Sequence, residues 1–222
     1  MFNFVTTFIF SVFLFHVIHA QAAYKFGVDL SVAGSAADFH CFFQQGYGAA
    51  LIQAYSPANG GSVDPNLIQN LQNSMAAGLG GEVYVTPTMS KDGKTQFDEV
   101  FNALTSLKVN TVWLQVTSPI KWSSNVQNNI NLIQSFVDRA LAVGVPPSIY
   151  TNWYDWQQIT GSYTGFSNLR LWYWNNFGSN IESAANFDDF SSFGGWTKPA
   201  VKQFASNQSL CGLIVNRNVF TA

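Results

Sequence analysis

The sequence predicts an irregular, TIM-like parallel β/α barrel with five strand–helix units, followed by about three further strands with little helix between them. From Lys25 onward, short apolar or alternating runs recur with helical patterns between them, an alternation that favours a parallel sheet with right-handed crossovers. After the fifth unit the helical patterns shorten while strand-like runs continue. The total of eight expected strands is enough to close a barrel.

The first 20 residues have the pattern of a signal peptide, with cleavage after Ala20 or Ala22. The run from Phe8 to Ile18 is apolar but too short to span a bilayer core as a helix. An uncleaved anchor is the alternative, although no basic stop-transfer flank follows the run. We therefore expect one domain over residues 24–222, extracellular or in the lumen of a secretory or lysosomal compartment, and no membrane association after cleavage.

The elements of this domain are expected in a regular order. The strands are Phe26–Ser31, Ala49–Ser56, Glu82–Met89, Thr111–Ser118, Pro147–Asn152, Leu169–Trp174, Val201–Ala205 and Leu213–Val219. The helices are Ser35–Gln45, Pro65–Leu79, Thr95–Leu107 and Asn125–Val143, with a short one near Trp153–Ile159. In the second helix Asp64 is the expected N-cap and Pro65 the first helical residue, where its missing N–H is tolerated.

The charge balance excludes one class of partner. The chain has 10 basic and 12 acidic residues, a formal net charge of -2, and no stripe of Lys or Arg. Proteins that bind nucleic acid need such a stripe to contact phosphates, so nucleic acid is not an expected partner. Abundant Asn, Gln, Ser and Thr with only 10% charged residues are typical of a secreted surface. We expect a monomer.

Two cysteines, Cys41 and Cys211, lie outside the signal peptide. In an oxidising compartment an even count predicts one disulfide, here between the first helix and the last strand. These two elements are neighbours only if the chain closes on itself, so a bridge fits a barrel; two buried free thiols are the alternative. Asn207-Gln208-Ser209 is a sequon that predicts glycosylation of Asn207.

The residue types narrow the chemistry. Only His40 remains after signal removal, and it lies on the expected first helix and not at a strand end. We therefore expect neither a multi-histidine metal site nor a Ser-His-Asp triad, and no metal and no cofactor. The remaining candidates for a functional site are carboxylate and aromatic side chains. Asp29 lies near the carboxyl end of the first strand, where side chains of such barrels converge on the active site. Its alternative interpretation is a helix cap or an acid bonded to backbone at the strand exit.

Several motifs in one order resemble those of the family 25 glycoside hydrolases, the Chalaropsis-type lysozymes. Gly27-Val28-Asp29-Leu30-Ser31 resembles the first-strand motif, in which an aspartate faces the glycan. Further matching stretches are Gln45–Tyr47, Val112–Leu114, Ser148–Thr151, Leu171–Tyr173 and Phe193–Phe204, and Cys211–Asn218 is similar to the last strand of the nematode branch. The resemblance covers nearly the whole domain. It implies bacterial cell-wall glycan, peptidoglycan, as partner, and a role in innate immune defence or digestion.

Three of the four acids that the resemblance leads one to expect are substituted. The family carries Asp-x-Glu on its fourth strand, where this chain has Gln115 and Thr117, and Asn216 replaces an aspartate on the last strand. Asp29 is the one matching acid. Because glycoside hydrolysis usually takes two carboxyl groups, we expect hydrolysis to be reduced or lost. Asp155, just beyond the fifth strand, is the best-placed replacement acid; Asp188 and Asp189 lie in a later loop.

A binding groove remains an expectation. Tyr55, Tyr150 and Trp172 lie at or near strand ends, where their rings could stack on sugar C–H groups, and core packing is the alternative for each ring. The side chains expected to bond N-acetyl groups are those of Gln115, Thr117 and Asn216.

Three functions follow, in order of preference. The first is a secreted glycan-binding lysozyme relative with little or no hydrolysis. The second is an active muramidase that uses Asp29 and an unidentified second acid. The third is a non-catalytic scaffold or interaction protein whose cleft is filled by side chains such as Trp174 or Trp122.

Overall fold

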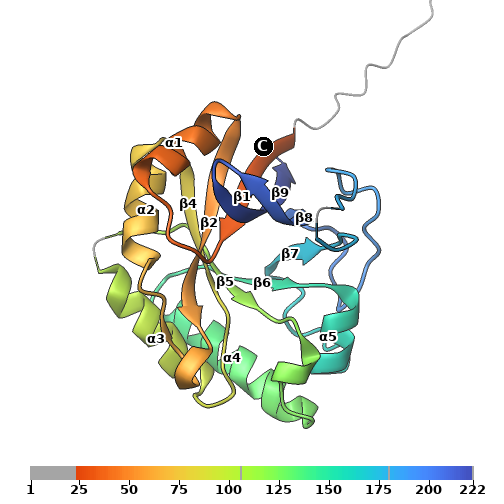
Figure 1. The fold of residues 1–222 in the computed structure, drawn as a ribbon. Helices are drawn as coiled ribbons and strands as arrows, with labels where there is room; N and C mark the ends of the chain where they lie inside the picture. The colour runs from red at the N-terminus through yellow and green to blue at the C-terminus, as the bar shows by residue number, and fades with distance from the viewer. Residues whose placement is uncertain (1–23, 106, 180, 222) are drawn as a thin grey trace, which may run out of the picture.

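The computed structural model describes residues 24–105, 107–179 and 181–221, so the expected signal peptide lies outside the described residues. Eight strands pair in a closed ring (Figure 1). In ring order they are β1 (Tyr24–Leu30), β2 (Tyr47–Ser56), β4 (Gly80–Val85), β5 (Val112–Gln115), β6 (Pro147–Thr151), β7 (Arg170–Trp174), β8 (Val201–Leu210) and β9 (Leu213–Thr221). The short β3 (Ser62–Val63) pairs with the end of β2. The expected irregular barrel is confirmed.

The ring is parallel from β1 round to β8, but β9 is antiparallel to both β8 and β1. The cause is local, because only Cys211 and Gly212 connect β8 to β9, with φ of 54° and 81°. Two positive φ values are what a type I′ hairpin turn requires, and such a turn reverses the chain. The barrel thus departs at its last strand from the parallel sheet that alternation alone predicts.

Five helices lie outside the barrel. They are α1 (Ala36–Gln44), α2 (Leu67–Ala76), α3 (Gly93–Leu104), α4 (Val126–Ala142) and α5 (Trp153–Thr160), with one-turn helices η1 (Ala58–Gly60) and η2 (Pro119–Lys121). Figure 1 shows α1 to α4 around one side, while loops cover the side near β7, β8 and β9. Among the helices of residues 24–105, 107–179 and 181–221, none is both long and apolar enough to cross a membrane.

The second helix begins later than expected. Its N-cap is Asn66 rather than Asp64, and Pro65 lies in the turn before it. The Asp64 Oδ1 atom accepts a hydrogen bond from the Asn66 backbone N–H at 2.8 Å. Asp64 therefore fixes the turn that leads into the helix, a role that short polar acids perform as readily as capping.

Aromatic side chains fill the interior of the barrel. One buried cluster takes a residue from each of six strands: Leu51, Tyr84, Trp113, Tyr150, Trp172 and Val201. Trp172 lies at its centre, stacked on Tyr150 with ring centroids 3.9 Å apart and edge-on to Trp113 at 5.8 Å. A larger cluster packs the helices against the outer face of the strands. The interior is a packed core, as barrel interiors of eight strands are.

The predicted disulfide is confirmed. Cys41 in α1 is bonded to Cys211, with the two Cα atoms 5.9 Å apart. Cys211 lies in the turn before β9 rather than within the last strand. Because β9 pairs with β1, the bridge ties α1 to the β8–β9 turn beside the strand pair that closes the barrel.

Candidate functional site

Asp29 is buried among uncharged amides. It lies near the end of β1 and is 3% exposed. Its Oδ1 atom accepts a hydrogen bond from Asn216 Nδ2 at 2.7 Å, and its Oδ2 atom accepts two, from Asn218 Nδ2 at 2.8 Å and Gln203 Nε2 at 2.9 Å. Asn218 is fixed in turn by the Trp172 indole, which donates to its Oδ1 at 2.9 Å. Within the described residues, no carboxyl group bonds to Asp29.

The protonation of this site is set by burial. Burial raises the pKa of Asp29 above its ordinary value, while the three amide donors oppose the rise. Burial, followed by the charge of Asp29, also raises the pKa of Tyr84 and of Tyr150 well above the usual tyrosine value. Both tyrosine hydroxyls are therefore neutral at physiological pH. The side chains bonded to Asp29 are amides, which donate hydrogen bonds to its carboxyl group but do not act as acids or bases at neutral pH.

Gln115 and Thr117 belong to a chain of uncharged hydrogen bonds across three strand ends. Gln53 Nε2 donates to Thr86 Oγ1 at 3.0 Å, and that hydroxyl donates to Gln115 Oε1 at 2.6 Å. Gln115 Nε2 then donates to Thr117 Oγ1 at 3.0 Å. The indole of Trp122 donates to the Thr117 carbonyl at 3.0 Å, which fixes the Trp122 ring at the end of this series of hydrogen bonds.

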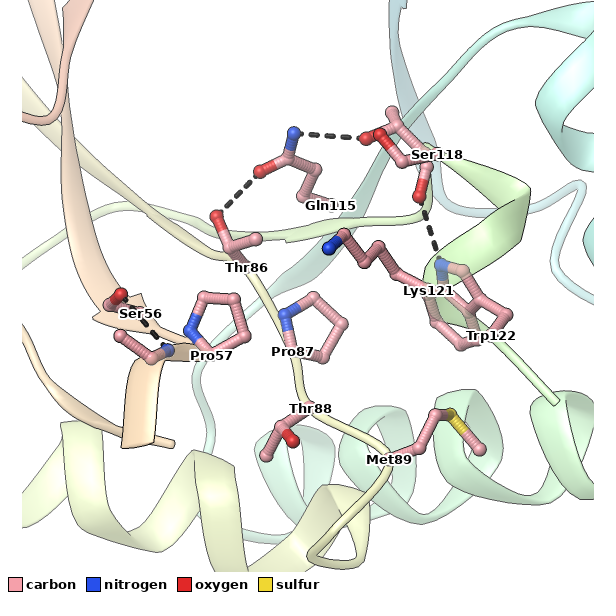
Figure 2. Close-up of a pocket in the computed structure, with 12 residues that line it drawn as sticks. Ser56, Pro57, Thr86, Pro87, Thr88, Met89, Gln115, Ser118, Lys121 and Trp122 are labelled. Carbon is pink, nitrogen blue, oxygen red and sulfur yellow. Dashed lines mark hydrogen bonds between the residues drawn. The ribbon is translucent and has the colours of Figure 1, made fainter. Parts of the chain in front are cut away.

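This chain of hydrogen bonds lies along a hollow of about 500 Å³ at the carboxyl ends of β2, β4 and β5 (Figure 2). The hollow mixes apolar and uncharged polar walls with one ammonium group. Its lining residues are Ser56, Pro57, Ala58, Thr86, Pro87, Thr88, Met89, Gln115, Thr117, Ser118, Lys121 and Trp122.

Two smaller hollows continue from the first. The second, of about 270 Å³, shares Thr117 and Ser118 with it and adds Tyr150, Asp155, Trp174, Asn176 and Gln203. The third, of about 240 Å³, shares Trp174 and is lined further by the exposed rings of Trp153 and Tyr154. We call the three together the barrel-end groove. The volume of the first hollow and the mixture of aromatic and polar walls along the groove are those of a ligand site.

Asp155 supplies a buried carboxyl group to this groove, whose lining residues do not include Asp29. Asp155 is 4% exposed, and the Trp174 indole donates to its Oδ2 atom at 3.1 Å. Burial raises its pKa, against the hydrogen bonds from Trp174 and the Ser118 backbone. The charges of both Asp29 and Asp155 raise the pKa of Tyr150. Tyr150 therefore lies within electrostatic reach of two carboxyl groups.

The other sequence-predicted residues fall in different places. Asn216 contacts Asp29, and Tyr150 is 6% exposed at the wall of the second hollow. Trp172 and Tyr55 are each 0% exposed, so a sugar reaches neither ring face unless covering residues move. Tyr55 instead donates to Glu99 Oε2 at 2.6 Å, which ties β2 to α3.

Asn207 and Asp188 lie outside the groove, whereas Asp189 lines its third hollow. Asn207 is exposed on β8, and its Nδ2 atom donates to Ser179 Oγ at 2.9 Å. Asp189 accepts hydrogen bonds from Lys202 Nζ at 2.7 Å and Tyr173 OH at 2.6 Å, an arrangement that fixes its loop to the barrel. Asp188 is exposed and bonded to Asn186.

Sequence reasoning missed two of the three amides that hold Asp29. Asn218 follows Asn216 by two positions on β9, and side chains two apart share one face of a strand, so this signal was present. Gln203 lies between Lys202 and Phe204 on β8, and nothing in the sequence shows that it is the one directed at Asp29.

Comparisons with known proteins show which family the chain resembles. The profile of the family described as "Lysozyme-like protein 1" matches residues 20–204. "Lysozyme-like protein 7" of Caenorhabditis elegans is 44% identical over 211 residues, covering 90% of this chain and 74% of the relative. "Probable GH family 25 lysozyme 5" of Dictyostelium discoideum is 34% identical over 214 residues, covering 93% and 95%.

Solved structures show the same fold at low identity. A muramidase from Trichobolus zukalii superposes with a TM-score of 0.70 at 20% identity, covering 89% of this chain and 94% of that one. A bacterial lysozyme from Streptomyces coelicolor has a TM-score of 0.68 at 18% identity, covering 91% and 94%. Since the family profile matches most of the chain and these relatives are similar over nearly all of it, the chain belongs to the lysozyme-like family of glycoside hydrolase family 25 proteins.

Proposed function

We propose that this is a secreted lysozyme-family protein that binds bacterial peptidoglycan in the barrel-end groove, in innate immune defence or digestion, with hydrolysis reduced or lost. One observation carries the proposal. Gln115 and Thr117 are joined by uncharged hydrogen bonds at the carboxyl end of β5, where the family resemblance places a pair of acids.

The loss of those acids has a calculable effect. A general acid in the transition state contributes typically about 10²- to 10⁴-fold in rate, and neither an amide nor a threonine hydroxyl protonates a leaving oxygen at neutral pH. Asp29 accepts hydrogen bonds from three amides and, among the described residues, has no bonded partner acid.

The groove nevertheless has the features of a glycan site. Trp122, Trp153, Tyr154 and Trp174 present rings along it, and amide and hydroxyl groups lie between them. Ring faces and hydrogen-bonding amides are the two groups that a neutral amino sugar needs. The Cys41–Cys211 disulfide supports secretion, because such bridges persist in oxidising compartments.

Two assays on the secreted protein test this function. Binding is measured by sedimentation with insoluble peptidoglycan, and hydrolysis by the clearing of a bacterial wall suspension. We expect binding without clearing. Clearing by the wild-type protein contradicts the loss of hydrolysis, and a failure to sediment contradicts binding and favours the scaffold function.

A double variant tests whether the substitutions are the cause. Gln115→Asp with Thr117→Glu restores two ionisable groups at the end of β5 and should produce clearing, while Gln115→Asn with Thr117→Ser keeps the site uncharged and should not. A folded, wall-binding acidic double variant without clearing would show that more than these two side chains has diverged.

Asp155 supports a second candidate function, a working muramidase that uses Asp29 and Asp155. Its carboxyl group is buried, lines the groove beside Gln203 and has a raised pKa, which is what a general acid needs. Under this function the wild-type protein clears walls and Asp155→Asn abolishes clearing while wall binding stays unchanged. Equal clearing by wild type and variant would exclude Asp155 as the acid.

A further inference from the structure

The barrel-end groove contains a single basic side chain. Of the described residues that line its three hollows, only Lys121 is basic. It lies at the end of η2, and Figure 2 shows its ammonium group projecting into the first hollow, toward Thr86 and beneath Gln115. The position is concave and partly apolar, with Pro57 and Pro87 also in the wall. Lys121 is exposed, which leaves its charge accessible to a ligand in the hollow.

This ammonium group has no counter-ion. Five of the ten basic side chains of the protein hold an ion pair. Lys121 holds none, and its Nζ atom has no hydrogen-bond partner within residues 24–105, 107–179 and 181–221. The first hollow contains no carboxyl group, and the only acid in the adjoining second hollow, Asp155, is bonded to Trp174.

The side chains at the end of β5 that line the first hollow together with Lys121 are uncharged. Acids at positions 115 and 117 would lie on the same wall as Lys121 and would compete with any anionic ligand for it. Gln115 and Thr117 instead satisfy one another and leave the positive charge of Lys121 free. Lys121 is therefore the one charged side chain among the described residues that line the first hollow.

We propose that Lys121 binds a carboxylate carried by the muramyl residue of the glycan, and so makes the groove selective for muramyl glycans over uncharged N-acetylglucosamine polymers. This proposal rests on the proposed function of glycan binding. The carboxylate has two sources: the lactyl group of a muramyl residue without its peptide, and the acidic groups of an attached stem peptide. In both cases the partner of the ammonium group is the same, and a chitin oligomer offers none.

Calorimetric titration of the intact secreted protein separates these cases. Three soluble tetrasaccharides are compared: the alternating glucosaminyl–muramyl glycan with free lactyl groups, the same glycan with stem peptides, and chitotetraose. Lys121→Met should weaken binding of at least one muramyl glycan about tenfold, the usual scale of one charge-assisted hydrogen bond, and change chitotetraose affinity less than about twofold. The muramyl glycan affected identifies the source of the carboxylate.

Matched variants control for fold and for net charge. Lys25→Met removes an exposed lysine at the amino end of β1, away from the groove, and should leave all three affinities unchanged. Lys121→Arg keeps the charge and should retain selectivity. Rising salt should weaken muramyl binding by the wild type but not by Lys121→Met, because only the wild type uses an ion pair.

Two results would overturn the role of Lys121 while leaving the proposed function intact. One is equal affinity of wild type and Lys121→Met for both muramyl glycans, and the other is an equal loss for chitotetraose, which would indicate altered groove shape. If the wild-type protein binds none of the three glycans, the proposed function itself fails, and the role of Lys121 fails with it.

Discussion

Removal of the Cys41–Cys211 disulfide should be the most destabilising change that leaves the core packing intact. The bridge joins residues separated by 170 positions, so it constrains most of the unfolded chain. On the chain-entropy treatment, closing a loop of that length stabilises the folded state by about 5 kcal/mol at 25 °C. For a domain of this size, each kcal/mol shifts the unfolding temperature by about 2–4 °C, which predicts a loss of about 10–20 °C.

The perturbation is the double variant Cys41→Ala with Cys211→Ala, measured by urea and thermal unfolding beside the oxidised wild type. Alanine keeps the helix at position 41 and is no worse than cysteine at position 211, where φ is positive. The urea dependence of the free energy should also steepen, because the unfolded chain without a bridge exposes more surface. A fall of less than about 3 °C with an unchanged urea slope would refute the reasoning.

Three further changes have predicted outcomes. Gly93→Ala would place a Cβ 2.1 Å from a backbone oxygen of α4, so it should lower the free energy of unfolding, measured in urea, by about 3 kcal/mol. The control Gly48→Ala, whose Cβ has its nearest contact at 3.9 Å, should leave that free energy almost unchanged. Similar losses in the two variants would contradict this prediction. Lys202→Met removes the fully buried partner of Asp189 and should lower the free energy of unfolding by about 2 kcal/mol. It should also make residues 184–199 more susceptible to limited proteolysis, because Lys202 also bonds the Ala184 carbonyl. An unchanged digestion rate would contradict this role of Lys202. Burial raises the pKa of Asp29 above 3.8, so the folded protein binds this proton more tightly than the unfolded chain, and its contribution to stability falls as pH rises from 3.8 through the raised pKa. The unfolding free energy of the wild type minus that of Asp29→Asn should therefore decrease over that window, and an increase would show that the three amide donors outweigh burial.

The barrel was predictable because its signals are local. Alternation of strand-like and helix-like runs marks each unit, and Cys41 with Cys211 adds a constraint that only a closed chain satisfies. The direction of β9 was not predictable from alternation. It depends on the two-residue turn at Cys211 and Gly212, which reverses the chain where a helix would have kept it parallel.

The site was predictable in part. Asp29 and Asn216 were identified from sequence, and the structure places them in direct contact. The rings of Tyr55 and Trp172 were expected near a sugar, yet both are fully buried, because a strand end can direct a side chain into the barrel or against a helix as well as into the groove. Residue type and position along a strand do not distinguish these directions.

The sequence by itself determined the fold class, the family and the absence of acids at positions 115, 117 and 216, since these follow from residue identity and local pattern. Only the tertiary structure decided that Gln203 and Asn218 hold Asp29, that Asp155 shares the groove and that Lys121 lacks a counter-ion. The physical reason is that hydrogen bonding, burial and charge pairing depend on distances between side chains far apart in the chain, and closure of the barrel sets those distances.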